Sequence, residues 1–306
     1  MEIRLNHRIC RNREEILNAS TPEVAAFLDE WFAPSDFVWG HTSGSTGTPK
    51  PVGLLKRDME ASARLTNDFF DITCRSVMLL CLSPDYIAGK MMIVRALLSG
   101  ADLLVVTPSS LPLTTIDEPI DFAAMVPAQV VESLKSTMQK SKLSRITSLI
   151  IGGAPLSPGT EVELEKLSVD TYATYGMTET VSHVALRRIG DSLSLYRALG
   201  GISFSIDERN CLIIHAPHFS VKEFVTNDVV ELVDSRNFRW IGRYDHVINT
   251  GGIKVFPELI EKKIAGLFTR RFFVTSCDDL KWGESVALVI EGEALSPVSY
   301  THLTLP

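Results

Sequence analysis

The stretch His41-Thr42-Ser43-Gly44-Ser45-Thr46-Gly47-Thr48-Pro49-Lys50 gathers hydroxyl groups, glycines and a lysine. Gly44 and Gly47 allow positive φ angles and a close approach of the backbone to a ligand. Successive N–H groups in such a turn form a concave anion site, the hydroxyls add donors, and Lys50 adds a mobile positive charge. The stretch therefore predicts a clamp for polyphosphate.

The flanking sequence argues against two other readings of this stretch. A flexible Ser/Gly linker is not expected between the apolar segments 37–39 and 51–55. The phosphate loop of nucleotide hydrolases has four residues between its glycines, with Lys-Ser/Thr directly after the second one. Here Ser45 and Thr46 alone separate the glycines, and Pro51 follows Lys50, so a different class of phosphate loop is indicated.

Length, charge and cysteine content set the broad class. The chain has 306 residues, an apolar fraction of 45% and a formal net charge of −7. Its length suits one large core plus a smaller domain, and its negative charge argues against a general nucleic-acid binder. The scattered cysteines suit buried thiols in a reducing compartment, and no stretch approaches the ~18 apolar residues of a membrane span. Since no signal peptide is visible, we expect a cytoplasmic protein.

Apolar strands alternate with amphipathic helices in the first part of the chain. Strands are expected at 37–39, 77–82, 102–106, 122–126 and 148–151, and helices at 22–32, 57–70, 88–98, 127–138 and 158–167. This alternation predicts an α/β fold with mostly parallel sheets covered by helices. Ligands of such sheets lie beyond the carboxyl ends of the strands. Short apolar runs from about residue 184 predict a small antiparallel β subdomain.

A second group of candidate site residues lies at two later strand ends. Gly152 and Gly153 would let a flat ring lie against the backbone. Tyr175, Thr178 and Glu179 offer an aromatic face, a hydroxyl and a carboxylate. Mg²⁺ prefers one or two protein oxygens beside phosphate and water. Taken alone, these groups also fit a plain turn and ordinary surface residues.

The loop 42–50 closely resembles the signature loop of the adenylate-forming enzymes, which include acyl-CoA and aryl-CoA ligases, luciferases and peptide-synthetase adenylation domains. Tyr-Gly-Met-Thr-Glu-Thr at 175–180 matches a second signature of that family. The resemblance implies a shortened adenylate-forming fold that uses ATP and Mg²⁺, with coenzyme A as co-substrate. It places the outer phosphates of ATP on the first loop, adenine against 152–155 and Tyr175, and Mg²⁺ on Glu179.

A third stretch supports the same resemblance. Asp228 follows Asn227 where the family usually has Gly-Asp, with the aspartate on the ribose hydroxyls. Asn is a mild departure, because it tolerates left-handed conformations best after Gly. The run 242–261 resembles the junction between the family's large and small domains. There, Arg243 would contact ribose or phosphate, and Asp245 would be the hinge.

The resemblance thus assigns a complete set of site residues. The nucleotide-binding residues are Thr42, Ser43, Gly44, Ser45, Thr46, Gly47, Thr48, Gly152, Gly153, Ala154, Pro155, Tyr175, Gly176, Thr178, Asp228 and Arg243. The catalytic residues are Lys50, Thr178, Glu179, Arg243 and Asp245. Gly251 and Gly252 would lie beside the pantetheine channel in a second conformation.

The expected domain organisation follows the motifs. It comprises a short leader with one helix (1–36), a large AMP-binding domain (37–244) that includes the β subdomain (184–244), a partial small α+β C-terminal domain (245–293), and a tail (294–306). The family's last signature, a Gly-Lys pair near the C-terminus, is absent. The tail resembles translated sequencing-adapter read-through, which predicts a truncated gene model with a non-native end.

The acyl substrate is chosen in this family by the region between the two signatures. Lys90 and Arg95 there can meet a carboxylate on the substrate, although a solvated Lys90 is an equal alternative. His183 is a candidate for the acyl pocket, against a packed or exposed histidine. The short leader and the segments 83–92 and 152–157 resemble the compact o-succinylbenzoate–CoA ligases of menaquinone (vitamin K2) biosynthesis, whose substrate carries a second carboxylate.

The sequence therefore predicts an ATP-dependent, AMP-forming acid–thiol ligase that makes an acyl-adenylate and then a CoA thioester. The alternatives are another adenylate-forming ligase, a truncated nucleotide-binding homologue without full turnover, and a phosphate-loop kinase or ATPase. The expected partners are a small carboxylic acid, ATP and CoA. Neither nucleic acid nor a membrane span is expected. The sequence leaves open whether the chain forms a homodimer.

Overall fold

The computed structural model describes residues 2–41, 51–268 and 270–292. The chain divides into two compact units. The first comprises Met1–Thr226 and Val230–Trp240, and the second Asn227–Val229 and Ile241–Pro306. No helix within the described ranges is long and apolar enough to cross a membrane.

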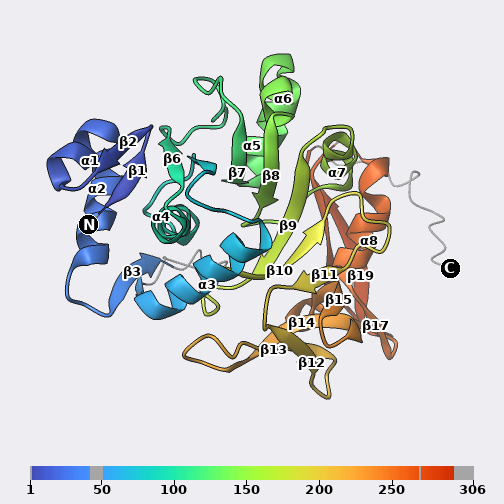
Figure 1. Ribbon diagram of the computed structural model, residues 1–306. Coiled ribbons are helices and arrows are strands. Elements are labelled where there is room, and N and C mark those ends of the chain that lie inside the picture. Colours follow the sequence, from blue (N-terminus) through green and yellow to red (C-terminus); the bar gives the residue numbers. More distant parts are fainter. Residues whose placement is uncertain (1, 42–50, 269, 293–306) are drawn as a thin grey trace. The chain divides into compact units, whose positions relative to one another are not determined.

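A parallel sheet occupies the first unit (Figure 1). In spatial order its parallel strands are β1 (Ile3–Leu5), β6 (Asp102–Val105), β5 (Val77–Leu80), β7 (Ile120–Met125), β8 (Ile146–Ile151) and β9 (Asp170–Gly176). At the outer edge, β2 (Arg8–Cys10) pairs antiparallel with β1. This arrangement confirms the α/β class predicted from the alternation of strands and helices.

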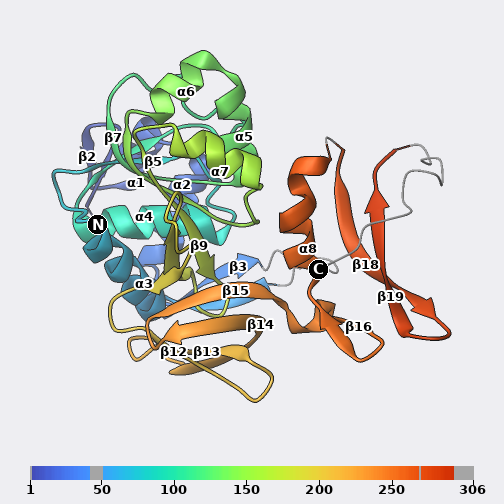
Figure 2. The ribbon, with the colours of Figure 1, turned by 90° about the vertical axis from the view of Figure 1, so that its right-hand side faces the viewer.

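Helices cover both faces of this sheet (Figure 2). One layer contains α3 (Lys56–Phe69) and α4 (Ile87–Ser99), and the other contains α5 (Pro127–Lys135), α6 (Thr137–Leu143) and α7 (Pro158–Glu165). Met78 and Leu80 of β5 belong to the first core, and Leu79 between them belongs to the second. The division follows from the strand geometry, since successive side chains point to opposite faces.

The helix expected over 127–138 is wrong, because the structure has two helices there. The Ser136 side chain accepts a hydrogen bond from the backbone N–H of Gln139 and so caps α6. Serine is a preferred N-cap residue, so a new helix begins directly after α5 ends.

The leader also contains more secondary structure than the single helix expected. It contains β1, β2, α1 (Arg13–Ala19) and α2 (Pro22–Phe32), and β1 pairs with β6 in the main sheet. The Asn12 side chain accepts from the N–H of Glu15 and caps α1. Strands of three residues carry too little alternation to be recognised from sequence.

The strand expected at 37–39 does not join the parallel sheet. Instead β3 (Phe37–His41) pairs antiparallel with β4 (Pro51–Leu55) in a sheet of two strands. The phosphate-loop sequence 42–50 connects these two strands and lies outside the described residues.

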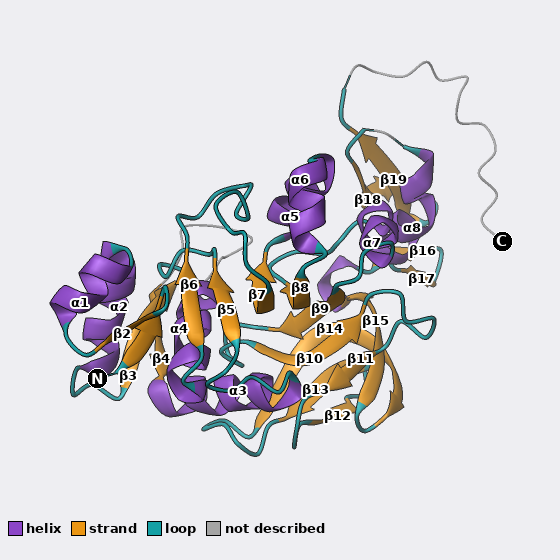
Figure 3. Cartoon of the chain, turned by 45° about the horizontal axis from the view of Figure 1, so that its top comes forward, coloured by secondary structure: helices purple, strands orange, loops and turns teal. Residues whose placement is uncertain are grey.

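Beyond β9 the large sheet becomes antiparallel, as predicted (Figure 3). Its order continues through β10 (His183–Arg188), β11 (Tyr196–Ala198), β15 (Asn237–Arg243), β14 (Glu223–Asp234), β13 (Cys211–His215) and β12 (Ser203–Ile206).

The second unit has its own antiparallel sheet and helix. The sheet order is β17 (Ile253–Val255), β16 (Ile248–Thr250), β19 (Gly283–Ile290) and β18 (Phe272–Asp279). It is accompanied by α8 (Pro257–Ile264) and the 3-10 helices η1 (Tyr244–His246) and η2 (Ala265–Leu267). As the sequence predicts, α8 begins at Pro257, whose fixed φ suits a first helical turn.

Candidate active site

The candidate site of the first unit lies at the carboxyl ends of β8 and β9. These strands are parallel neighbours, with Ile151 paired to Ala173. The turn 152–155 and the loop 177–182 therefore leave the sheet at the same edge. Most of the turn and the carboxylate residue Glu179 are exposed. The structure thus brings two sequence-predicted groups together at the edge where parallel sheets bind ligands.

The turn after β8 depends on Gly152. Its N–H donates to the Met125 carbonyl at 3.2 Å, and Thr174 Oγ1 donates to the Ile151 carbonyl at 3.3 Å. A Cβ at Gly152 would lie 2.4 Å from Thr174 Oγ1, so no larger residue fits without a shift. Gly153 follows with φ of +90°, a conformation that favours glycine. Close packing therefore excludes a side chain at position 152, and the positive φ favours glycine at position 153.

Thr180 organises the loop that presents Thr178 and Glu179. Its buried hydroxyl accepts from the Met177 N–H at 3.0 Å and lies 2.8 Å from the Ser182 carbonyl, to which it can donate. Sequence reasoning assigned no role to Thr180. The sequence nevertheless contained a signal for this role, because a threonine hydroxyl often accepts a hydrogen bond from a nearby backbone N–H in a turn.

Aromatic packing orients Tyr175 at the end of β9. Its ring centroid lies 5.7 Å from that of Tyr196 and 5.0 Å from that of Phe238, the latter in an edge-on arrangement. Gly176 follows, and a Cβ there would lie 2.3 Å from the Ser182 carbonyl oxygen. The close approach of β9 and β10 thus explains this glycine. Stacking of Tyr175 on adenine remains a prediction.

Arg95 of α4 is a buried cation, with 1% of the residue exposed. Its Nη2 donates to Ser182 Oγ at 3.0 Å, while its Nε has no partner in the described part of the chain. Burial lowers the pKa of Arg95 to about 9, so the group stays charged at neutral pH. No described carboxylate lies within ion-pair distance. A buried charge normally requires such a partner, so an anionic ligand is a physically reasonable complement.

His183 is packed, which is the alternative that the sequence favoured. Its Nε2 lies 3.2 Å from Thr66 Oγ1, and its Nδ1 lies 3.3 Å from Ser182 Oγ. Burial, and then the charge of Arg95, hold the pKa of His183 well below its usual range. The imidazole is therefore neutral at pH 7 and can support Ser182 beside Arg95.

Lys90 is neither solvated nor free to meet a substrate. The residue is 7% exposed, and its Nζ lies 3.4 Å from Glu30 Oε2. The same ammonium lies 4.8 Å from the centroid of the Phe27 ring. Since these groups satisfy its charge within the fold, we remove Lys90 from the candidate substrate residues.

In the second unit, Arg243 lies beside both aspartates that the sequence groups with it. Its Nε and Nη2 bind the two carboxylate oxygens of Asp245 at 3.0 and 3.2 Å. Its Nη1 lies 4.0 Å from Asp228 Oδ1. The hydrogen bonds from Arg243 lower the pKa of Asp245. Three predicted site residues therefore form one charged cluster in this unit.

Gly251 and Gly252 form the two-residue turn between β16 and β17. Their φ angles are +56° and +84°, as a tight hairpin turn of this kind requires. A Cβ at Gly251 would lie 2.6 Å from a Trp282 ring atom. Hairpin geometry alone accounts for both glycines, and their role beside pantetheine remains a prediction.

The predicted phosphate clamp falls outside the described residues. Its residues are Thr42, Ser43, Gly44, Ser45, Thr46, Gly47, Thr48 and Lys50.

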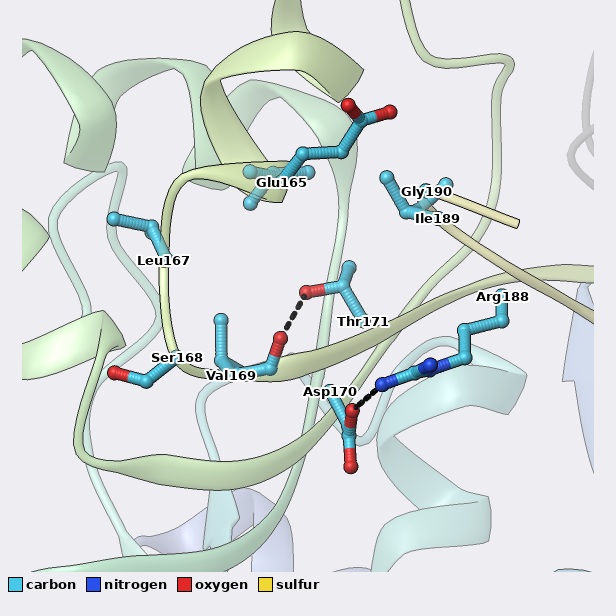
Figure 4. Close-up of a pocket in the computed structure, with 10 residues that line it drawn as sticks. Glu165, Leu167, Ser168, Val169, Asp170, Thr171, Arg188, Ile189 and Gly190 are labelled. Atoms are coloured by element: carbon cyan, nitrogen blue, oxygen red, sulfur yellow. Dashed lines mark hydrogen bonds and ion pairs between the residues drawn. The ribbon is translucent and has the colours of Figure 1, made fainter. Parts of the chain in front are cut away.

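A surface hollow of about 440 Å³ lies near the start of β9 (Figure 4). Its lining includes Glu165, Asp170 and Arg188. Asp170 and Arg188 form an ion pair with each other. Because Asp170 begins β9 and the candidate site lies beyond its last residue, this hollow is not the predicted nucleotide site.

Comparison with known proteins identifies the family. The model of the AMP-binding enzyme family matches residues 8–205. The chain belongs to the AMP-binding enzyme family. One AMP-binding relative, an acyl-CoA synthetase (AMP-forming)/AMP-acid ligase II-like protein of Dyadobacter fermentans, is 35% identical. Its alignment covers 91% of this chain and 83% of that protein, with a TM-score of 0.69.

Two further similar proteins carry a narrower name. A protein of Mycobacterium tuberculosis named "Probable 2-succinylbenzoate–CoA ligase" is 27% identical over 84% of this chain and 71% of its own length. An O-succinylbenzoate coenzyme A synthetase of Bacillus subtilis, solved with ATP and magnesium ion, is 18% identical with a TM-score of 0.71. That alignment covers 85% of this chain and 61% of the synthetase. At this identity the second likeness shows the adenylate-forming fold alone.

The described residues fit the nucleotide and metal that the AMP-binding family implies. Gly152 and Gly153 open the turn at the sheet edge where β9 ends with Tyr175 and Gly176. Glu179 is an exposed carboxylate at this edge of the sheet. A single carboxylate supplemented by phosphate oxygens and water is a donor set that suits Mg²⁺.

Proposed function

We propose that this AMP-binding enzyme is an ATP-dependent acid–CoA ligase. In the first step, a substrate carboxylate oxygen attacks the α-phosphorus of ATP, and the bond to pyrophosphate breaks. In the second step, the thiolate of coenzyme A attacks the acyl carbon of the resulting acyl-adenylate, and AMP leaves. The observation that carries the proposal is the meeting of the 152–155 turn and the Thr178–Glu179 loop at adjacent strand ends.

The residue roles follow from charge and position. We assign the outer phosphates to the loop 42–50 with Lys50, the α-phosphate to Thr178, and the ribose to Asp228 with Arg243. Mg²⁺, held by Glu179, would neutralise phosphate charge. No side chain needs to form a covalent bond with substrate. Alignment and charge stabilisation therefore account for the rate, and loss of one such contact costs on the order of 3 kcal/mol.

We further propose an o-succinylbenzoate-type acid as the substrate, which would place the enzyme in menaquinone biosynthesis. Such an acid carries a second carboxylate besides the one that is activated. Arg95, buried and without a described counter-ion, could neutralise that carboxylate, and Ser182 and His183 would hold its guanidinium in place. The name of the Mycobacterium tuberculosis relative supports the same acid class.

A panel of acids tests this proposal. Pyrophosphate release and thioester formation are measured with ATP, coenzyme A and o-succinylbenzoate, benzoate or a fatty acid. We expect o-succinylbenzoate to have the highest kcat/KM. Equal activity with benzoate would overturn the acid assignment, whereas release of ADP in place of AMP would overturn the reaction class.

A further inference from the structure

The leader helix α2 contacts the hairpin that carries the phosphate-loop sequence. Glu30 Oε1 on α2 accepts a hydrogen bond from the backbone N–H of Trp39 in β3, at 2.7 Å. Its other oxygen, Oε2, lies 3.4 Å from Lys90 Nζ on α4. One carboxylate therefore joins α2, β3 and α4.

The hairpin gains an anchor that its own pairing cannot supply. Among the described residues, β3 and β4 form a sheet with each other alone. A hairpin of two strands needs further packing in water, and Val38 and Leu54 supply part of it in the first core. Glu30 supplies a charged acceptor to the β3 backbone from outside the hairpin, and hydrogen bonds to charged groups are stronger than neutral ones.

The other side of the hairpin is held by the same part of the leader. Lys56, directly after β4, donates through Nζ to the Ala33 carbonyl at 2.7 Å. Its backbone N–H donates to the Asp36 carbonyl at 2.8 Å. The segments on both sides of 42–50 are therefore tied to α2 and the residues that follow it.

Lys90 explains why an acidic residue stands at position 30. Its side chain is 9% exposed, and a buried ammonium without a counter-ion would be costly. Glu30 provides that counter-ion while its other oxygen binds Trp39.

We propose that Glu30 is a positioning residue for ATP use: it fixes β3, the strand that precedes 42–50 in the sequence. The inference rests on the proposed function, because it takes 42–50 as the ATP loop. Since Glu30 acts through the hairpin, its loss should affect ATP more than the acid.

The test uses variants in a Lys90→Met background, which avoids a stranded buried cation. Glu30→Ala/Lys90→Met removes the acceptor for Trp39, whereas Glu30→Gln/Lys90→Met keeps an uncharged acceptor. Asp29→Ala is the matched control on the same helix, because its carboxylate pairs with Arg13 at the surface. The measurements are hydrogen exchange of the Trp39 amide and the separate KM values for ATP and acid.

Relative to Lys90→Met, we expect Glu30→Ala/Lys90→Met to speed Trp39 exchange and raise the KM for ATP, each about tenfold. The KM for the acid should stay within about twofold, and Glu30→Gln should restore most of both losses. Unchanged exchange and KM, an equal rise in both KM values, or the same effect from Asp29→Ala would overturn the proposal.

A folding failure and a failure of the proposed function can each be distinguished from a failure of the Glu30 proposal. If Glu30→Ala/Lys90→Met does not fold, Glu30→Asp/Lys90→Met withdraws the acceptor by one methylene and should change exchange and KM in the same direction. If the unsubstituted chain releases no pyrophosphate with any acid, the proposed function fails. Trp39 exchange then decides by itself whether Glu30 anchors β3, and unchanged exchange still overturns that role.

Discussion

Arg243 binds both carboxylate oxygens of Asp245, through Nε at 3.0 Å and Nη2 at 3.2 Å. Arg243, which is assigned to nucleotide contact, is thus bound to Asp245, which is assigned to the hinge. This fork-like geometry makes the pair specific as well as attractive. A change at Asp245 should therefore also release Arg243.

We predict that Asp245→Ala slows thioester formation more than acyl-adenylate formation, by about tenfold, if Asp245 serves as the hinge. Single-turnover measurements of pyrophosphate release and of CoA transfer separate the two steps. Asp245→Glu, which keeps the charge, is the control. An equal loss in both steps would argue against the hinge role.

Thr180→Val should loosen the loop that presents Thr178 and Glu179. The change removes the hydroxyl that binds the Met177 N–H while it keeps the shape of the side chain. The Met177 N–H is partly buried, so its loss of a partner should cost about 1 kcal/mol in urea unfolding. Thr180→Ser retains the hydroxyl and should be close to the unsubstituted protein. Equal stability of the valine and serine variants would contradict the assignment.

Arg95→Met should affect stability and substrate binding in opposite directions. Removal of a buried cation that has no described counter-ion should raise the free energy of unfolding, by about 1 kcal/mol. The KM for o-succinylbenzoate should rise at least about tenfold, with the KM for benzoate nearly unchanged. Urea unfolding and steady-state kinetics measure the two effects. A similar change in KM for both acids would remove Arg95 from the proposed substrate site.

Gly152→Ala tests the close packing of the turn after β8. The new methyl group would lie 2.4 Å from Thr174 Oγ1. We expect the KM for ATP to rise severalfold because the turn must shift. The double variant Gly152→Ala/Thr174→Ala removes the obstructing hydroxyl and should recover part of the loss, whereas Gly152→Ala/Thr174→Ser should not. Additive effects in the alanine double variant would show that the two positions are not coupled.

His7 should give the leader a pH-dependent contribution to stability. Its ring nitrogens lie 3.0 Å from Glu118 and 2.8 Å from Asp102. The hydrogen bond to Glu118, together with the charge of Asp102, raises the pKa of His7 above its ordinary value. The contribution is therefore fully present below pH about 6.5 and is lost as pH rises through the higher folded-state pKa.

Urea unfolding as a function of pH checks this, with His7→Asn as the comparison. Asparagine tolerates the positive φ of 66° at this position, so backbone strain does not confuse the result. The stability difference between the two proteins should shrink above neutral pH. A difference that stays constant from pH 5 to pH 9, or that grows with pH, would contradict the titration of His7.

Local patterns predicted much of the fold. The helix expected at 158–167 corresponds to α7, and the strand expected at 148–151 corresponds to β8. The two glycines expected at a strand end do follow β8, where a Cβ at Gly152 would meet Thr174 Oγ1. The alternation of strands and helices gave the α/β class for the same local reason.

Long-range contacts could not be predicted in this way. Lys90 meets Glu30 across 60 positions of sequence, so the sequence offered only a substrate contact or a solvated side chain for this lysine. The pairing of β1 with β6 and the separate hairpin of β3 and β4 likewise depend on tertiary packing. Thr180 is different, because its bond to Met177 spans three residues and could have been anticipated.

The most direct test of the account is the identity of the products formed by the 306-residue chain with ATP, Mg²⁺ and o-succinylbenzoate, before and after addition of coenzyme A. Mass spectrometry should detect acyl-AMP and pyrophosphate first, and AMP with a CoA thioester afterwards. Formation of ADP or free phosphate, or no nucleotide product with any acid tested, would contradict the activation of a carboxylic acid as its adenylate.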